Sequence, residues 1–438
     1  MRANLRRQAL ILTLANGYTR GAGFVMHLLM ARLMGPQALG VMEMAHSVIM
    51  LAITPVTAGI PSSVSRLTAQ RSGTEARKVL RAGESLVKRM SAILAPALLI
   101  LSPLLAWLLG DMRTLPAILT SVPDVMLLGL CAVYCGYFYG LEDARTPALN
   151  ECVEQTVRVG LAVGLLVLLP KQSIAVTAAL PGLAESIAGV AVMLMFRRAM
   201  PSKEPRLAAD ASVRREILSL SAPTTLSRLC LTGMRALHAV LLPVCLRCSG
   251  LTAEAATAQF GLLNGMAMPL MMLPGIVTSA VCMVATPAVS RQEKKPELLR
   301  RTVRKMTLCA AAIGAAAMAG LFLLADFAAG TLYRTIALAP VIRWLCPLAM
   351  VMAVHQVIIG MVTGLGLQRK TLTGTIAGSA LTLVLTALLC PMPAWRIFGA
   401  VAALMAGHLL RLIWCTAVLW NAVSTSAQKS GEKIKNRG

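Results

Sequence analysis

The sequence predicts an all-α polytopic membrane protein with about twelve transmembrane helices, arranged as two pseudo-symmetric six-helix lobes. Of its 438 residues, 57% are hydrophobic and only 14% are charged, whereas about a quarter of the residues in a soluble domain are charged. The apolar residues form runs of roughly 20, the length that crosses a hydrocarbon core of about 30 Å. The basic residues lie mostly between these runs, and the two halves of the chain repeat short motifs in the same order.

The apolar runs, taken in chain order, define the individual helices. The sequence has no alternating strand pattern of the kind that membrane barrels show. Its first run follows three arginines but is too long for the apolar region of a cleaved signal peptide, so we expect it to be retained as a span. The predicted spans are 9–34, 38–62, 90–110, 116–140, 147–169, 174–196, 217–246, 256–287, 306–328, 338–366, 371–391 and 397–421.

The distribution of Lys and Arg predicts the orientation of these spans. With the N-terminus in the cytoplasm, the cytoplasmic segments contain 30 of the 42 basic residues and the opposite side contains 5. Such an excess on one side is typical of cytoplasmic loops. We therefore predict a bacterial cytoplasmic membrane protein with both termini in the cytoplasm. Its net charge of +24 then indicates contact with anionic lipids and not with nucleic acid, because the sparse aromatic residues do not interleave with the basic ones.

A repeat across the chain predicts the two lobes. Val-Ser-Arg follows the second span at 64–66 and the eighth span at 289–291. Leu39-Gly40 and Phe260-Gly261 open the same two spans. Six spans separate the halves, so both halves have the same orientation and a pseudo-two-fold axis runs along the membrane normal, with a cavity between two lobes. The predicted divisions are an N-lobe at 1–196, a cytoplasmic linker at 197–216, a C-lobe at 217–421 and a basic tail at 422–438.

Polar side chains inside the spans are the candidates for a binding site. An arginine at the centre of a membrane helix costs about 2.5–3.5 kcal/mol, so it needs a partner or a wet cavity. Arg20 lies midway along the first span and Arg235 lies at a similar place in the seventh; pairing within each lobe is the structural alternative for both. The predicted cavity residues are Asn16, Arg20, Glu43, Glu154, Arg158, Arg228, Arg235 and Asn264.

Three of these residues have alternative interpretations. Glu154 and Arg158 are spaced i, i+4, the order that favours an ion pair within one helix. Glu43 can neutralise Arg20 or accept a coupling proton. Asp124, Glu185 and Asp326 are interpreted as interfacial residues near span ends.

Prolines interrupt the second and eighth spans, and paired helix breaks in the two halves indicate the moving or binding region. The predicted hinge residues are Pro55, Pro61, Pro269 and Pro274.

Enzymatic activity is excluded by the motifs. The sequence has no P-loop, no G-x-S-x-G and no metal-ligand cluster. We therefore predict no cofactor and no metal site. Without a nucleotide site, transport draws its energy from an ion gradient, the membrane potential or the substrate gradient, and the choice between Na⁺ and H⁺ stays open.

Three segments carry a resemblance to a known family. Residues 59–66 (GIPSSVSR), residues 136–140 with 146–147 and 154–158, and residues 265–270 with 273–274 resemble segments of the stage V sporulation protein B-like polysaccharide exporters. The resemblance covers residues 5–421 in order. This family belongs to the multidrug/oligosaccharidyl-lipid/polysaccharide (MOP) superfamily, which also contains lipid II flippases and multidrug (MATE) exporters.

The resemblance implies two six-helix lobes that rock about a central cavity, and a lipid-linked sugar pyrophosphate as substrate. Arg20 matches the first of the essential basic residues in the first span of lipid II flippases. Met26 stands where those flippases have a second basic residue, and Pro269 where they have a further arginine. This chain also stops after twelve spans, without the two extra C-terminal helices of the flippases. These departures favour the sporulation-type branch over lipid II itself.

The prediction is accordingly a monomeric flippase for a polyprenyl-pyrophosphate-linked saccharide, a peptidoglycan precursor or another cell-envelope unit. One alternative is a cation-coupled multidrug exporter of the MATE type, against which the arginine-rich interior argues. A second alternative is a non-transporting scaffold that recruits enzymes of envelope or spore-cortex synthesis through its basic loops.

Overall fold

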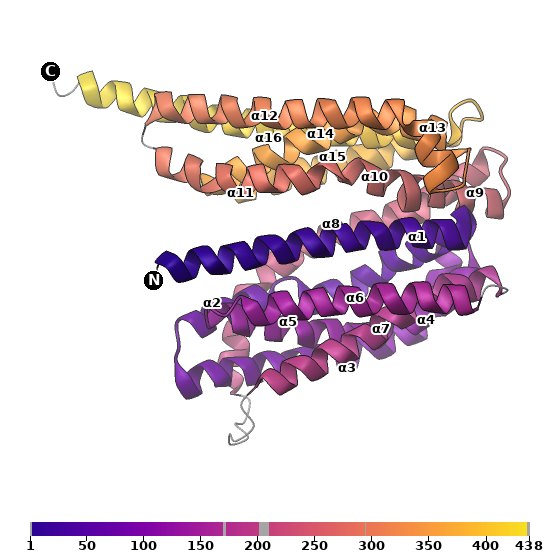
Figure 1. Cartoon of the computed structure of the whole chain (residues 1–438), viewed down its shortest axis with the longest axis horizontal. Coiled ribbons are helices and arrows are strands. Elements are labelled where there is room, and N and C mark those ends of the chain that lie inside the picture. Colours follow the sequence, from indigo (N-terminus) through magenta and orange to yellow (C-terminus); the bar gives the residue numbers. More distant parts are fainter. Residues whose placement is uncertain (1, 170–171, 201–209, 294, 436–438) are drawn as a thin grey trace. The chain divides into compact units, whose positions relative to one another are not determined.

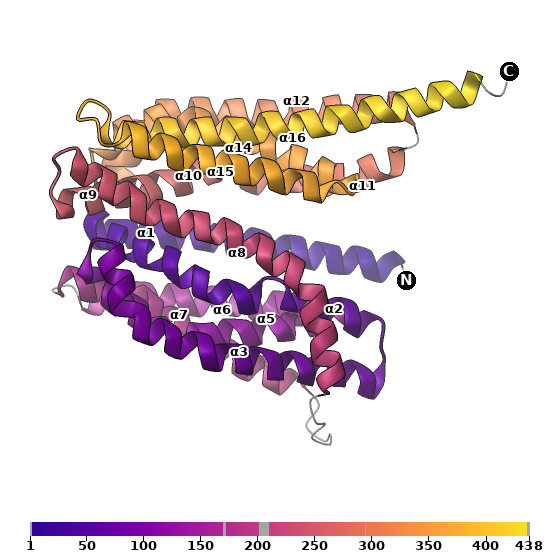
Figure 2. The same cartoon turned by 180° about the vertical axis from the view of Figure 1, so that it is seen from behind.

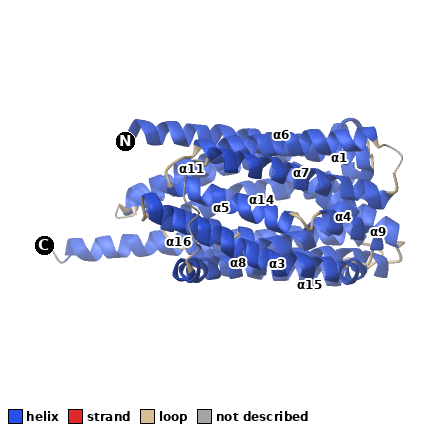
Figure 3. Cartoon of the chain, turned by 90° about the horizontal axis from the view of Figure 1, so that it is seen from below, coloured by secondary structure: helices blue, strands red, loops and turns tan. Residues whose placement is uncertain are grey.

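The computed structural model describes residues 2–169, 172–200, 210–293 and 295–435, and all regular structure in these residues is helical (Figure 3). The predicted all-α fold is confirmed. Contacts divide the chain into two compact units: unit 1 contains Met1–Pro243 and Ala253–Gly261, and unit 2 contains Val244–Thr252 and Leu262–Gly438. Grouping by contacts follows packing and not the sequence repeat, so the predicted lobe boundaries stay a prediction.

Unit 1 is a helical bundle built from the first half of the chain (Figure 1). Within it, α6 packs along both α1 and α7, and α5 packs against α2 and α3 (Figure 2). The elements are α1 (Arg2–Thr57), α2 (Ile60–Ala69), α3 (Gly73–Leu108), η1 (Met112–Thr114), α4 (Leu115–Thr120), α5 (Asp124–Gly140), α6 (Arg145–Leu168), α7 (Ile174–Ala199), α8 (Ala211–Cys248) up to Pro243, and α9 (Ala253–Phe260).

Unit 2 contains the remaining helices. Its core is an apolar cluster in which α11, α12, α14 and α16 meet around Val289, Val357 and Met361. The elements are η2 (Gly261–Ala267), of which Gly261 belongs to unit 1, α10 (Met268–Met272), α11 (Pro274–Gln292), α12 (Pro296–Leu323), α13 (Ala325–Phe327), η3 (Ala328–Leu332), α14 (Leu338–Gly364), α15 (Gln368–Leu389) and α16 (Arg396–Lys435).

The longest helix of unit 1, α1, is two helices joined at a kink. Gly35 has φ 73° and ψ 172°, values outside the helical region, and Pro36 follows it. Glycine adopts such positive φ values at little cost because it has no Cβ. The 56 residues of α1 would measure about 84 Å as one straight helix, far more than a bilayer core. The kink falls between the first two predicted spans, at 9–34 and 38–62.

The helices are long and apolar enough for a multi-pass membrane protein. Eight described helices pass a test of length and hydropathy, and up to ten do so when two bent helix pairs each count as one span. The test counts α1 once, although it contains two predicted spans. It does not include α6, whose 24 residues contain Glu151, Glu154 and Arg158. Every one of the twelve predicted spans lies on helices that the structure describes.

Within unit 1, small residues and polar contacts hold helix α9 against the other helices. An added Cβ at Gly40 would overlap the carbonyl oxygen of Thr257, so the backbones of α1 and α9 touch. Asp111, between α3 and η1, accepts hydrogen bonds from Arg113 and from Thr257, the latter at 3.0 Å. Burial raises the pKa of the Asp111 carboxyl, but hydrogen bonds and the charge of Arg113 outweigh it and hold the pKa below its ordinary value.

Candidate functional site

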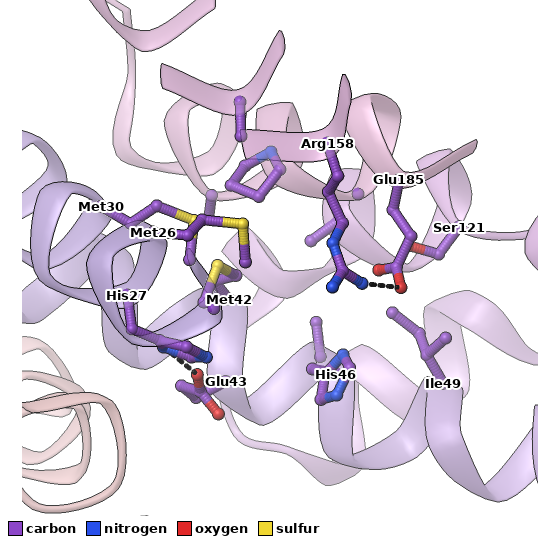
Figure 4. Close-up of a pocket in the computed structure, with 17 residues that line it drawn as sticks. Met26, His27, Met30, Met42, Glu43, His46, Ile49, Ser121, Arg158 and Glu185 are labelled. Carbon is purple, nitrogen blue, oxygen red and sulfur yellow. Dashed lines mark hydrogen bonds and ion pairs between the residues drawn. The ribbon is translucent and has the colours of Figure 1, made fainter. Parts of the chain in front are cut away.

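A polar pocket of about 270 Å³ lies inside unit 1, among α1, α4, α6 and α7 (Figure 4). Three methionines of α1 lie close together on one side of it, next to His27 and Glu43, and Arg158 and Glu185 lie on the other side (Figure 4). We call it the N-half pocket. Its lining includes Met26, His27, Met30, Met42, Glu43, His46, Ser121, Arg158 and Glu185.

Both parts of α1 contribute to this pocket. His27 lies before the kink at Gly35 and Glu43 lies after it, and the imidazole Nδ1 of His27 is 4.0 Å from Oε1 of Glu43. His27 is about one-third exposed and Glu43 about one-fifth. The two form an ion pair only when the imidazole is protonated, so the kink brings together a proton acceptor and a carboxylate from distant turns of one helix.

Arg158 is the only guanidinium that lines the N-half pocket among the described residues, and it is held across two helices. Its Nη1 donates to Oε1 of Glu185 on α7 at 3.2 Å, and its Nη2 donates to Gln155. Both partners of the ion pair are largely buried. The expected ion pair within α6 is replaced by this one: Glu154 acts on Arg158 only through its charge. Packing of α6 against α7 supplies a better-placed carboxylate than the neighbouring turn of α6 does.

The expectation that Asp124 and Glu185 are interfacial is wrong. Asp124 is 1% exposed and accepts a hydrogen bond of 2.7 Å from Ser186. Glu185 lies at the middle of α7 and faces the pocket (Figure 4). Its position at the centre of the predicted span 174–196 was the signal that could have found it, because a lone carboxylate in an apolar helix needs a partner. Four carboxylates and one guanidinium therefore lie in or beside this pocket, which makes it suited to a cation or a proton.

The other predicted site residues do not line the N-half pocket. Asn16 and Arg20 are exposed on α1, and Arg228 and Arg235 are exposed on the part of α8 that belongs to unit 1. Across the described ranges, none of these three arginine side chains has an ion pair with a carboxylate. Asn264 lies on η2 in unit 2. The structure thus joins Glu43 and Arg158, with Glu154 beside them, in one pocket.

The predicted hinge prolines lie at irregular points of the helices. Pro55 is inside the last turns of α1, and Pro61 is in the first turn of α2, after a break at residues 58–59. In unit 2, Pro269 is in the first turn of α10, and the helices on either side of Leu273 are bent by 44° where Pro274 begins α11. Their role as hinges stays a prediction.

No group of three or more His, Cys, Asp or Glu residues within the described part of the chain is arranged to hold a metal ion.

Residues 5–293 match a protein family described as polysaccharide biosynthesis protein. The chain belongs to the polysaccharide biosynthesis protein family. This assignment agrees with the resemblance at residues 59–66, 136–140, 146–147 and 154–158, all of which lie inside the matched region.

Relatives of this polysaccharide biosynthesis family protein extend over nearly the whole chain. Stage V sporulation protein B of Bacillus subtilis (strain 168) is 27% identical over 418 residues, which are 92% of this chain and 80% of that protein. In fold, the chain is similar to a multidrug resistance MATE family transporter of the MOP superfamily in its inward-facing conformation, with a TM-score of 0.77, 17% identity and 96% coverage of each chain.

The lipid II flippase MurJ in an inward closed conformation is similar to a comparable degree, with a TM-score of 0.74 and 11% identity over 95% of this chain and 91% of the flippase. The protein is therefore a multi-pass helical membrane protein of the polysaccharide biosynthesis protein family, and it shares its fold with these two transporters. The predicted fold and family are confirmed.

Proposed function

We propose that this protein moves a polyprenyl-pyrophosphate-linked saccharide, a peptidoglycan precursor or another cell-envelope unit, across the cytoplasmic membrane by alternating access. The observation that carries the proposal is Arg20, an arginine midway along a membrane helix that has no carboxylate partner among the described residues. A guanidinium at that depth needs an anion, and its forked donors match a phosphate oxygen pair.

Arg228 and Arg235 extend this argument to a second helix of unit 1. Both are exposed on α8, and α8 packs beside the later part of α1, where Thr54 and Thr232 form a hydrogen bond of 3.0 Å. Three arginines without carboxylate partners favour a ligand with more than one negative charge. Pyrophosphate has that property, and the relation to a polysaccharide biosynthesis family supports a saccharide attached to it.

The N-half pocket has a different part in this proposal. Glu43, Glu154 and Arg158 were predicted to bind substrate, but the excess of carboxylates over guanidinium favours a proton or Na⁺ over a phosphate. We assign this pocket to ion coupling. The imidazole of His27 lies 4.0 Å from Glu43 in this pocket.

The test uses the full-length protein in liposomes that contain a polyprenyl-pyrophosphate-linked saccharide, with an assay of head-group accessibility. We expect Arg20→Ala and Arg235→Ala each to lower the translocation rate by about tenfold or more, since each removes a charge-assisted bond. Arg20→Lys should retain part of the activity because it keeps the charge and loses the fork.

Arg343→Ala is the matched control. Arg343 pairs with Asp326 in unit 2 and has no assigned role, so its removal should leave the rate near that of the wild type. Unchanged rates in both Arg20→Ala and Arg235→Ala would show that these arginines do not bind the pyrophosphate.

A multidrug exporter is the second candidate, and the acidic N-half pocket is the observation that favours it. Carboxylates in an apolar cavity attract organic cations. Drug sensitivity separates the two candidates: loss of an exporter sensitises cells to lipophilic cations, whereas loss of the proposed flippase leaves that sensitivity unchanged and alters the cell envelope.

A further inference from the structure

A second cavity in unit 1, of about 500 Å³, has a chemistry unlike that of the N-half pocket. It lies where the end of α1, α2, α5 and α6 meet, and its lining includes the hydroxyl groups of Thr57, Ser62 and Ser65, the phenol of Tyr139 and the carboxylate of Glu151. No Lys, Arg or His lines it within the described residues. We call it the hydroxyl cavity.

Local backbone breaks create the hydroxyl cavity. Helix α1 ends at Thr57, and α2 starts at Ile60 with Pro61 in its first turn. The side chains of Thr57, Ser62 and Ser65, on either side of this break, line the cavity. At Gly136 of α5, an added Cβ would overlap the carbonyl oxygen of Pro61, so α5 touches α2 backbone to backbone. Two of the segments that carry the family resemblance, 59–66 and 136–140, thus converge on this one cavity.

Two of the hydroxyl groups, those of Ser62 and Thr57, face a ligand as acceptors. The Oγ of Ser62 donates to the carbonyl oxygen of Gly59 at 2.8 Å, and the Oγ1 of Thr57 donates to that of Ile53 at 3.1 Å. Their protons are thereby occupied while their lone pairs remain available. The carboxylate of Glu151 adds two further acceptor oxygens, and Tyr139 lies beside it.

This combination selects against an anion. A phosphate needs donors or cations, whereas the hydroxyl cavity offers acceptors and a negative charge. It suits an uncharged group that has several O–H or N–H donors and an apolar face that can lie against the ring of Tyr139. A sugar ring has both properties, with hydroxyl donors around its rim and C–H groups on its faces. A volume of about 500 Å³ is within the range of small-molecule sites.

Helix α6, which contributes Glu151 to the cavity, also packs against the helix that carries Arg20, α1. Tyr18 on α1 and Thr156 on α6 form a hydrogen bond of 2.7 Å between their hydroxyl groups. Arg20 is two residues after Tyr18, and Glu151 is five residues before Thr156, about 7.5 Å along α6. The carboxylate and the guanidinium are therefore carried by two adjacent helices at neighbouring levels.

We propose that the hydroxyl cavity binds a neutral sugar residue of the lipid-linked substrate, with Glu151 and Ser62 as hydrogen-bond acceptors, Ser65 as a further polar contact and Tyr139 as the surface for the ring. This inference rests on the proposed function, and it adds a saccharide site that is separate from the arginines assigned to the pyrophosphate.

The test measures equilibrium binding of two lipids to the full-length protein in nanodiscs: polyprenyl pyrophosphate, and the same lipid with one N-acetylhexosamine attached. We expect the wild type to bind the sugar-bearing lipid about tenfold or more tightly than the sugar-free lipid, a gain typical of hydrogen bonds to a charged acceptor. Glu151→Gln should lose most of that gain and keep the affinity for the sugar-free lipid. Arg20→Ala should weaken the binding of both lipids.

Two further variants control for folding and for loss of charge. The double variant Ser62→Ala, Ser65→Ala changes less volume and should reduce the same gain. Glu297→Gln replaces an exposed glutamate at the start of α12 and should change neither affinity. Unchanged binding of the sugar-free lipid shows that each variant is folded.

The outcomes separate this inference from the proposed function. If the wild type binds and translocates both lipids equally well, the hydroxyl cavity does not bind sugar, although the flippase function stands. If tetraphenylphosphonium, used as an organic cation, binds in a manner that needs Glu151 while the sugar adds no affinity, the cavity is a cation site and the inference is overturned. If neither lipid binds or is translocated, the proposed function fails and the inference fails with it.

Discussion

Arg158 illustrates how the surroundings of a residue limit what it can bind. Its guanidinium is bonded to Glu185 on α7 and to Gln155 on its own helix, and Glu154 contributes only its charge. This guanidinium is largely buried and has a carboxylate partner. Arg20 has no such partner among the described residues, and for that reason Arg20 and not Arg158 is proposed to bind an anion.

The pair of Arg158 and Glu185 leads to a prediction about stability. Glu185→Ala leaves the guanidinium without its bonded carboxylate, so we expect a loss of about 1.5–3 kcal/mol in the free energy of unfolding. Glu154→Ala removes a carboxylate that makes no hydrogen bond to Arg158 and is expected to have a clearly smaller effect. Thermal unfolding of both variants in the same detergent measures the difference. A larger loss for Glu154→Ala would show that the ion pair within α6 is the stabilising one.

At the scale of helices, two of the repeated motifs meet at a close backbone contact, where α1 crosses α9 and the start of η2. Leu39-Gly40 and Phe260-Gly261 are related by the sequence repeat, and Gly40 and Gly261 are in direct backbone contact. Small residues at helix crossings in membranes permit such approaches because lipid provides no hydrophobic force that would press the helices together. The repeat predicted that these two glycines are equivalent, but it did not predict that they touch.

Substitution at this crossing has an expected outcome with a control in the same helix. Gly40→Ala introduces a Cβ into the carbonyl oxygen of Thr257, so it should lower the thermal stability. Gly17→Ala, also in α1, meets nothing within 4 Å and should be neutral or slightly stabilising, by about 0.4–1 kcal/mol, because it reduces the entropy of the unfolded chain. Equal effects of the two substitutions in a melting experiment would rule out close packing at Gly40.

For the whole molecule, the distribution of Lys and Arg predicts the orientation in the membrane. With the predicted spans, 30 basic residues lie on the side of the N-terminus and 5 lie on the other side. A fusion of green fluorescent protein after residue 438 should therefore fluoresce, since both termini are predicted to be cytoplasmic. Alkaline phosphatase fused after residue 250 should be active, because that loop is predicted to lie outside. The reverse pattern would invert the topology and the direction of transport.

The sequence by itself determined the helical membrane fold and the family of this protein. Run length, the distribution of basic residues and the short repeated motifs are local or statistical properties, and the bilayer converts them directly into helices. The predicted spans 9–34 and 38–62 also leave a gap at the kink of α1, where Gly35 and Pro36 disfavour a regular helix.

Only the tertiary structure decided which polar side chains meet. The pairing of Arg158 with Glu185, the burial of Asp124 and the proximity of His27 to Glu43 all depend on which faces of α1, α5, α6 and α7 are packed together. The same holds for the hydroxyl cavity, to which α1, α2, α5 and α6 contribute. Spacing along a chain limits contacts within one helix, but the rotation of each helix against its neighbours is set by side-chain packing between segments far apart in sequence, and periodicity does not encode that rotation.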